Sequence, residues 1–355
     1  MPFENESDRA DEREQMRSEA QHNGPAGVII ANTGSPDAPT PEAVYSYLAE
    51  FLMDDRIVQL PRWFWKLLVT KAILPKRQYT SAQRYRAVWM DEGSPLIVYE
   101  QRLAAKLERA LRASGCEARV RIGMSYGQHS LADACRQLKE EGCRSLTVLP
   151  AYPQSAYCIT GSVRDSFQRT FPAMNWDVPT AFVDHYGDDR IYCESVADTI
   201  RAAGYGEPGD RILFDFHSIP LKDRRAGDTY VDQIRASVEE IAARLNAPAG
   251  SWAICYSSVF GPHPEHWMGP LARDVLPEWG RAMAAGQLTG RVFFTTPGFS
   301  ADCLETLWDI PHELKPAFTD GGGDPERFIT VPPLNDSDCA VNTFLHVLRH
   351  HVPDV

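Results

Sequence analysis

The sequence lacks three features that would each assign it to a class of protein. None of its eight cysteines stands in a C-x-x-C pair. A zinc site or a disulfide framework is therefore not expected, and the thiols are predicted to be reduced. No apolar run reaches about 18 residues, so no segment is predicted to span a membrane. Basic residues are in deficit, with a net charge of -12, so nucleic acid is not an expected partner.

The N-terminal stretch also lacks an apolar core. Residues 1–25 are polar and dense in charge, which is the composition of a disordered acidic tail and not of a secretory signal peptide. Together with the reduced thiols, this composition predicts a cytoplasmic protein.

Strand-like and helix-like segments alternate along the rest of the chain. The predicted strands are GVIIANTG, RSLTVLPAY, RILFDFH, SWAICYSS, RVFFTTPGF and RFITVPPLND, and amphipathic stretches such as PLIVYEQRLAAKLERALRAS and TYVDQIRASVEEIAARL lie between them. This alternation predicts an α/β fold with parallel sheets and helical crossovers. The pattern ends near residue 200 and restarts after RAAGYGEPGD, so we predict domains at 26–203 and 204–335, and a closing helix at 336–355.

His217 stands at the end of the run ILFDFH, where a strand gives way to a Ser-Ile-Pro turn. Ligands of open α/β sheets bind beyond the carboxyl ends of the strands. His217 is therefore a candidate catalytic group. The alternative is a core imidazole satisfied by backbone groups, and the sequence leaves both interpretations open.

A second candidate follows the strand RVFFTTPGF. A helix is predicted to start near Ser300, which can serve as its N-cap, and Glu305, Asp309 and Glu313 recur at four-residue spacing on one face of it. We expect Pro311 to interrupt this helix. The row is either a solvated acidic face or a path for a cation that enters a cleft.

The segment LPRWFWKLLVTKAILPKR combines two Trp, one Phe and several aliphatic residues with cations. We favour a core helix for it. The alternative is an exposed apolar lip that contacts a membrane surface or an apolar ligand.

These motifs, taken in order, resemble the ferrochelatase family from about Gly27 to the last helix. The matching stretches are NTGSPDAPTPEAVYSYLAEFL, YRAVWMDEGSPL, GMSYGQHS, LPAYPQ, FHSIP, GPHPEHWMGP and PGFSADCLETL. The resemblance implies two Rossmann-like domains of the class II chelatase type, with the closing helix packed back on the first. It also implies insertion of Fe²⁺ into protoporphyrin IX to form protohaem, with coproporphyrin III or another tetrapyrrole as the alternative substrate.

The resemblance carries roles to particular positions. It implies that His217 and Glu305 are the catalytic pair and face the metal, together with Asp302 and Asp309. It places seven residues around the porphyrin: Thr33 below the ring centre, and Arg86, Ser94, Ser125, Tyr126, Tyr230 and Trp267 along the ring and its carboxylates. The chain departs from several bacterial relatives at Ser257–Gly261, where SSVFG replaces QSRFG and removes a cation.

The chemistry suits these residue types. A free-base porphyrin must lose two N–H protons as the metal enters, and a neutral His can accept a proton near working pH. Carboxylates and imidazole are suitable ligands for Fe²⁺ in transit. No cofactor is expected beyond the substrates porphyrin and ferrous iron. Some family members hold a [2Fe-2S] cluster, but the C-terminus here lacks the closely spaced cysteines that four thiolate ligands would need. A monomer and a homodimer both remain open, as does peripheral membrane contact.

Overall fold

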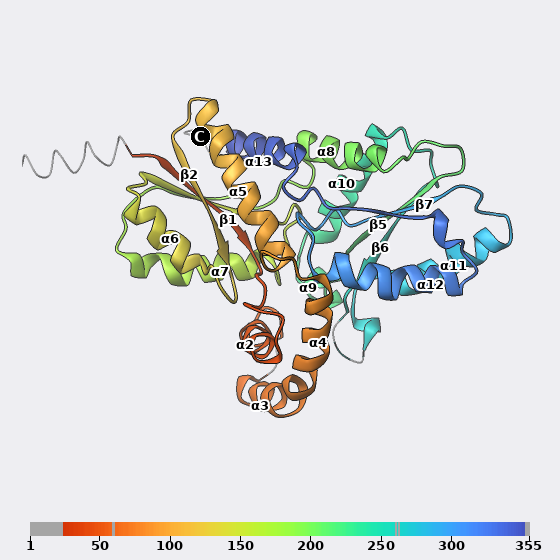
Figure 1. Cartoon of the computed structure of the whole chain (residues 1–355), viewed down its shortest axis with the longest axis horizontal. Coiled ribbons are helices and arrows are strands. Elements are labelled where there is room, and N and C mark those ends of the chain that lie inside the picture. Colours follow the sequence, from red (N-terminus) through yellow and green to blue (C-terminus); the bar gives the residue numbers. More distant parts are fainter. Residues whose placement is uncertain (1–23, 59–60, 260, 262, 352–355) are drawn as a thin grey trace, which may run out of the picture.

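The computed structural model describes residues 24–58, 61–259, 261 and 263–351. Most of the predicted tail at 1–25 and the last four residues of the predicted closing segment lie outside this range. Within it, the chain forms two halves, each built on a four-stranded sheet (Figure 1).

The first half contains a parallel sheet in the order β2-β1-β3-β4. Strand β1 is central and buried along its whole length, because helices cover both faces of a doubly wound sheet. The strands are β1 (Ala26–Asn32), β2 (Ala118–Met124), β3 (Ser145–Pro150) and β4 (Thr180–Phe182). The helices are α2 (Pro41–Leu52), α3 (Arg62–Leu68), η1 (Val69–Ile73), α4 (Leu74–Val88), α5 (Pro95–Ala113), α6 (Leu131–Glu140), α7 (Thr160–Thr170), η2 (Phe171–Met174) and α8 (Arg190–Ala202).

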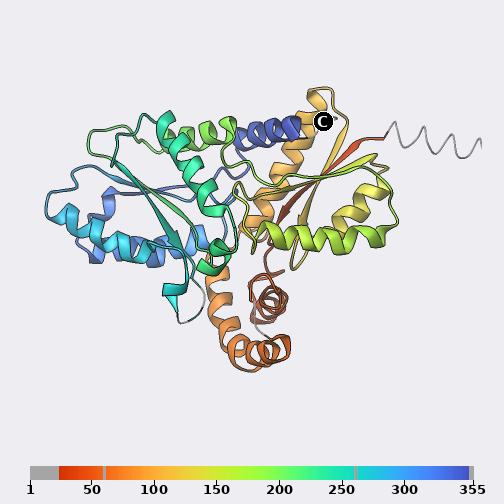
Figure 2. The same cartoon turned by 180° about the vertical axis from the view of Figure 1, so that it is seen from behind.

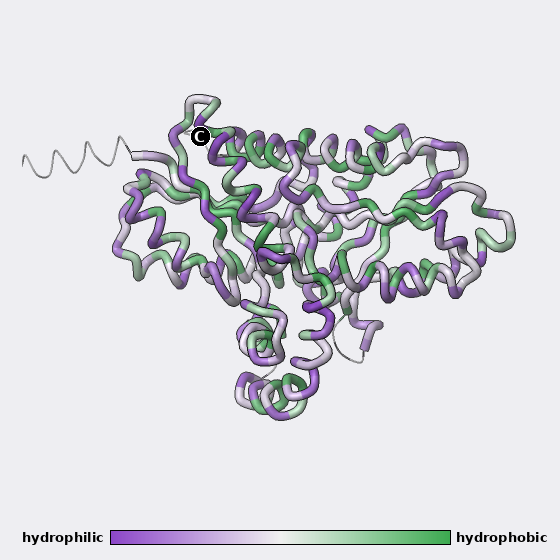
Figure 3. The backbone as a smooth tube through the Cα atoms, in the orientation of Figure 1, coloured by the Kyte–Doolittle hydropathy of each residue, from purple (hydrophilic) through white to green (hydrophobic). Residues whose placement is uncertain are grey.

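The second half repeats this arrangement with a parallel sheet in the order β6-β5-β7-β8. Figure 3 shows hydrophobic residues along the strands of both sheets. The strands are β5 (Arg211–His217), β6 (Trp252–Ser257), β7 (Val292–Thr295) and β8 (Phe328–Val331). The helices are α9 (Leu221–Arg225), α10 (Tyr230–Arg244), η3 (Pro264–His266), α11 (Ala272–Ala284), η4 (Glu305–Leu314), α12 (Lys315–Asp320), η5 (Pro325–Arg327) and α13 (Asp338–His351). The predicted α/β class is confirmed; the domain boundaries stay a prediction.

The closing helix α13 packs against α5 of the first half and against α8 (Figures 1 and 2). Its buried residues Phe344, Val347 and Leu348 join a core that also contains Leu107 of α5. The spacing 344, 347, 348 is the i, i+3, i+4 stripe of an amphipathic helix. The predicted return of the last helix onto the first half is therefore confirmed.

The Trp-rich segment forms a helical extension with α2 that projects away from both sheets (Figure 1). Trp65 is buried and Val69 and Leu74 pack beside it, but Trp63 is 76% exposed and Leu67 is 56% exposed. The favoured prediction of a core helix is wrong for this outer face. Helix α2 and the start of α4 cover one side of the segment, and no other described element covers the opposite side. In the described part of the chain, no helix is long and apolar enough to cross a bilayer.

The acidic segment after β7 also differs from prediction. Its helix is a π-helix, η4, that begins at Glu305 and continues through Pro311 to Leu314. Ser300 does not cap it, because the helix begins only after Leu304 and the Ser300 hydroxyl has no hydrogen-bond partner among the described residues. The proline therefore does not interrupt this helix, and π-helices recur at functional sites.

Candidate active site

His217 is the last residue of β5, and its ring orientation is fixed by its own backbone neighbour. The Nδ1 atom lies 2.7 Å from the carbonyl oxygen of Ser218. A carbonyl can only accept, so Nδ1 carries the proton and donates it. In the neutral ring, Nε2 is then unprotonated and carries a lone pair. The ring is half-buried, so this lone pair can meet a ligand.

One pocket brings His217 together with the acidic π-helix. Its walls come from the ends of β5, β6 and β7 and from one face of η4. The lining residues are Asp215, His217, Ser257, Ser258, Thr296, Phe299, Glu305, Thr306, Asp309, Ile310 and Leu314. The structure therefore gathers the predicted His217, Glu305 and Asp309 around one space.

Asp215 is a pocket residue that the sequence reasoning missed. It lies two positions before His217 on β5, and alternate residues of a strand face the same side. Its Oδ1 accepts hydrogen bonds from Ser257 Oγ at 2.9 Å and Cys255 Sγ at 3.4 Å. Burial raises the pKa of Asp215 to about 7. The signal in the sequence was a carboxylate inside the otherwise apolar run ILFDFH.

Asp309 shares the pocket and shows the same direction of shift. Burial, and then the charges of Glu305 and Glu313, raise the pKa of Asp309 to about 7, while Arg84 of α4 opposes that change. The Arg84 guanidinium lies 3.4 Å from Asp309 Oδ1 and 2.9 Å from Glu313 Oε1. The outer part of the acidic row is therefore bridged to the first half by one cation.

Asp302 is not among the residues that line this pocket. Its Oδ1 accepts a hydrogen bond from Thr306 Oγ1 at 2.7 Å, and its Oδ2 accepts one from Asn335 Nδ2 at 2.8 Å. The backbone N–H of Asp302 in turn donates a hydrogen bond to Asn335 Oδ1 at 2.7 Å. With both carboxylate oxygens engaged, the side chain anchors the start of η4.

The start of η4 lies against the first half of the molecule. Burial is the main reason why the pKa values of Tyr47 on α2 and Tyr85 on α4 are raised. The charge of Glu305 raises both pKa values further. Leu304 packs into the cluster that contains both tyrosines, beside Tyr126. The start of η4 in the second half therefore packs against α2 and α4 of the first half, next to the pocket.

The predicted porphyrin residues of the first half have diverse surroundings. Thr33 follows β1 and is half-buried. The Tyr126 hydroxyl donates a hydrogen bond to Asp54. Burial, and then this hydrogen bond, raise the pKa of Tyr126. Ser94 is buried, where its hydroxyl accepts a hydrogen bond from Ser35 at 2.6 Å.

Two further predicted residues of this half differ in exposure. Arg86 is exposed and reaches the carbonyl of Pro39 at 3.4 Å. The Ser125 hydroxyl is buried without a hydrogen-bond partner among the described residues.

The two predicted aromatic residues of the second half also differ. Trp267 is half-buried and pairs through its backbone with Pro220, just beyond the His217 turn. Tyr230 is 2% exposed and belongs to the main core, where burial raises its pKa. The structure therefore places Trp267 near the site and Tyr230 inside the protein.

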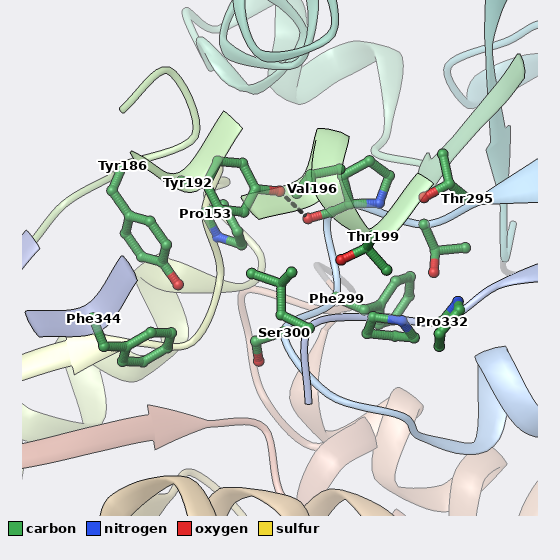
Figure 4. Close-up of a pocket in the computed structure, with 14 residues that line it drawn as sticks. Pro153, Tyr186, Tyr192, Val196, Thr199, Thr295, Phe299, Ser300, Pro332 and Phe344 are labelled. Atoms are coloured by element: carbon green, nitrogen blue, oxygen red, sulfur yellow. Dashed lines mark hydrogen bonds between the residues drawn. The ribbon is translucent and has the colours of Figure 1, made fainter. Parts of the chain in front are cut away.

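A second cavity of about 20 Å³ is lined by residues of both halves (Figure 4). It shares Thr296 and Phe299 with the pocket. The hydroxyls of Tyr186, Thr296 and Ser300 line it and have no hydrogen-bond partner among the described residues. A space of this size and polarity can hold an ordered water.

In the part of the chain that the structure describes, no group of three or more His, Cys, Asp or Glu side chains is arranged to hold a metal ion. All eight cysteines are free thiols.

Comparison with known proteins decides the family. The family model for ferrochelatase matches residues 25–352. The chain belongs to the ferrochelatase family. A ferrochelatase from Nitrosococcus oceani is 34% identical over 330 residues, covering 92% of this chain and 86% of the relative. One from Thioalkalivibrio sulfidiphilus is 36% identical over 326 residues, covering 90% and 85%.

Solved structures support the fold of this ferrochelatase. The structure of SirB from Bacillus subtilis with Fe³⁺ matches with a TM-score of 0.51 and 14% identity, covering 73% of this chain and 92% of that one. Family membership makes the chain a metal-inserting lyase of haem biosynthesis. The pocket at His217 is where its geometry gathers a base and carboxylates.

The buried carboxyl of Asp215 predicts a pH-dependent stability for this ferrochelatase. Its folded pKa is about 7, against an ordinary value of 3.8, so between these values the folded state binds the proton that the unfolded state releases. Stability from this group is lost as the pH rises from about 4 to 7. Asp215→Asn should therefore gain free energy of unfolding over the wild type on going from pH 5 to pH 8, on the order of 3 kcal/mol.

Urea denaturation at both pH values measures this difference, with the exposed Asp177→Asn as the control. An equal offset between Asp215→Asn and the wild type at pH 5 and pH 8 would show that the carboxyl titrates normally.

Proposed function

We propose that the chain inserts Fe²⁺ into protoporphyrin IX to form protohaem. The observation that carries the proposal is the single pocket in which His217, with its free Nε2, stands beside Glu305 and Asp309. In this proposal a tetrapyrrole binds between the two halves and presents its nitrogens to this group. No bound cofactor is needed, because iron and porphyrin are both substrates.

His217 is the base in this proposal. Metallation replaces two pyrrole N–H protons by one Fe²⁺, so the ring and the ion together release two protons. The Nε2 lone pair accepts one proton from the ring, passes it to solvent and then accepts the second, and the Nδ1–H bond to Ser218 stabilises the imidazolium that forms each time. This bond also stops the ring from turning its protonated nitrogen toward the substrate.

Glu305 and Asp309 exchange ligands with the incoming iron in this proposal. Carboxylate oxygens replace the waters of a hydrated cation one at a time. Asp309 lies one helical turn beyond Glu305, and Arg84 contacts it from outside. An ion that passes along the row would therefore displace the guanidinium before it reaches His217.

Protoporphyrin is favoured over coproporphyrin III by the charge at the rim. Coproporphyrin III carries four carboxylates and protoporphyrin two, with vinyl groups in place of the others. Ser257, Ser258 and Val259 carry hydroxyl and aliphatic side chains and no cation, and the two serines line the pocket. Arg84 is committed to Asp309 and Glu313. Fewer cations suit the less charged ring.

Removal of the base should separate chemistry from binding. His217→Ala should lower the rate of porphyrin metallation by at least about a hundredfold, which is the usual contribution of a general base. Porphyrin affinity should change little, because the walls of the cleft are intact. Absorbance spectroscopy with Fe²⁺ or Zn²⁺ measures the rate, and fluorescence quenching measures binding.

The control for this variant is His350→Ala, since His350 is exposed on α13. Near-normal turnover in His217→Ala would refute the assignment of the base, provided that the wild type metallates the same porphyrin.

Kinetics with both candidate substrates test the choice of ring. We expect kcat/KM for protoporphyrin IX to exceed that for coproporphyrin III by about tenfold or more, which corresponds to about 1.4 kcal/mol of differential binding in the transition state. Each porphyrin is assayed with Fe²⁺ under the same anaerobic conditions. A preference for coproporphyrin III would reverse the argument from rim charge.

We also propose that the lip formed by Trp63, Phe64, Leu67 and Leu68 contacts an anionic membrane surface. All four side chains are exposed. Residues 61–88 contain no Asp or Glu, and cations intersperse the apolar groups. Exposed aromatic residues with neighbouring cations are typical of interfacial helices. An apolar porphyrin would then pass from lipid to the cleft beside α4.

Vesicle sedimentation tests the lip. The wild type should bind vesicles rich in phosphatidylglycerol, and the double variant Trp63→Ser, Phe64→Ser should lose most of that binding while it stays folded. Tyr157→Ser is the matched control, because Tyr157 is exposed outside the lip. Unchanged binding of the double variant would show that another surface carries the contact.

A further inference from the structure

Glu100 is a buried acid that the proposed chemistry does not use. It lies on α5, inside the first half, and is 0% exposed. Its Oε1 accepts a hydrogen bond from Asn32 Nδ2, and its Oε2 has no hydrogen-bond partner among the described residues. A buried carboxyl with an unsatisfied oxygen costs stability. Such a group therefore needs an explanation other than packing.

Asn32 connects Glu100 to the cleft. It is the last residue of β1, and its Oδ1 accepts hydrogen bonds from Tyr152 Oη at 2.5 Å and from the backbone N–H of Thr33 at 2.6 Å. Tyr152 Oη and Thr33 Oγ1 are in turn hydrogen-bonded. Four side chains thus form one chain of contacts from the interior to Thr33.

The direction of the bonds in this chain follows from the acceptor oxygen of Glu100, together with the backbone N–H of Thr33, which donates to the carbonyl oxygen of the Asn32 amide. The carboxyl oxygen accepts, so the Asn32 amide must turn its NH₂ toward Glu100 and its carbonyl toward Tyr152. The single proton of the Tyr152 hydroxyl then goes to Asn32. Tyr152 Oη can only accept from Thr33 Oγ1. The Thr33 hydroxyl therefore donates its proton to Tyr152 Oη, and its own lone pairs stay available to accept a hydrogen bond.

The second half contacts a direct neighbour of this group. The backbone N–H of Tyr126 donates to the carbonyl of Thr33 at 3.0 Å, and Leu304, which follows Cys303, packs against the cluster that contains Tyr126. Cys303 lies two residues before Glu305. The Thr33–Tyr152 pair and the start of η4 thus approach one another from opposite halves.

We propose that Glu100 is a positioning residue, which acts through Asn32 and Tyr152 to aim the lone pairs of Thr33 at the pyrrole N–H groups of the bound ring. The proposal rests on the function proposed above. The Thr33 oxygen then accepts a hydrogen bond from a ring N–H on the face away from His217. It holds that N–H in place while His217 accepts a proton on the other face.

The charge state of Glu100 is compatible with this role. Burial raises its pKa to about 8, and the hydrogen bond from Asn32 opposes that change. Besides burial, the charge of Glu100 contributes to the raised pKa values of Tyr152 and Tyr186. A neutral Glu100 still offers its carbonyl oxygen to Asn32, so the chain keeps its direction below pH 8.

A double-mutant cycle tests the proposal. Glu100→Leu removes the acceptor, and Thr33→Val removes the hydroxyl while it keeps the side-chain shape. Each should lower kcat about tenfold with little change in the KM for porphyrin. The double variant should be no slower than Thr33→Val alone, because Glu100 acts only through Thr33. Glu100→Gln keeps an acceptor for Asn32 and should restore kcat to within about threefold of the wild type.

Tyr152→Phe is the second route if Glu100→Leu does not fold. It breaks the chain at its middle, so it should match Thr33→Val in kcat, and the two changes should not add. The proposal is overturned if Glu100→Leu or Tyr152→Phe lowers kcat by the same factor in the wild type and in Thr33→Val. It is also overturned if both of these single variants keep the wild-type kcat. A wild type that metallates no porphyrin would instead refute the proposed function itself.

Discussion

The hydrogen bond from His217 Nδ1 to the carbonyl of Ser218 is the interaction on which the site depends. It exists because β5 stops at His217 and the following turn brings a backbone carbonyl back to the ring. The turn is itself held by the backbone bond from Ser218 to Ser257 at the end of β6. The sheet thus fixes which nitrogen is basic, and a mobile loop histidine would have no such preference.

The carboxylates of the pocket face this base under a different constraint. Asp215 and Asp309 both hold protons more tightly than ordinary aspartates, because neither is fully solvated. A hydrated cation that approaches would replace those protons and relieve the cost of burial. In the function proposed above, these protons would leave as the cation binds, and the π-helix places Glu305 and Asp309 on the same pocket as the end of β5.

Sequence reasoning found the parts of this site that stand at strand ends. His217 and the acidic row follow apolar runs, and parallel sheets bring such ends to one edge. It did not find Asp215, since a single carboxylate inside a strand has no periodic signal, or Arg84, whose role depends on α4 crossing the π-helix.

The error in the lip segment has a different cause. Periodicity shows that a helix is amphipathic or wholly apolar, but not whether a partner layer exists. Trp65 has such a layer in α2, whereas Trp63 has none among the described elements. The prediction that Pro311 interrupts the helix is wrong, since the segment continues as a π-helix from Glu305 to Leu314, which the spacing of the acidic residues did not indicate.

The two halves contribute unequally to a reaction that must remove two protons from one flat ring. The second half supplies a base with a lone pair and carboxylates with shifted pKa values. The first half offers at Thr33 a hydroxyl whose own proton is directed inward by Tyr152, Asn32 and Glu100. A base on both faces would compete for the same protons. In the reaction proposed above, a base on one face and an oriented acceptor on the other let the protons leave one after the other, and the asymmetry comes from Glu100, which is buried in the first half.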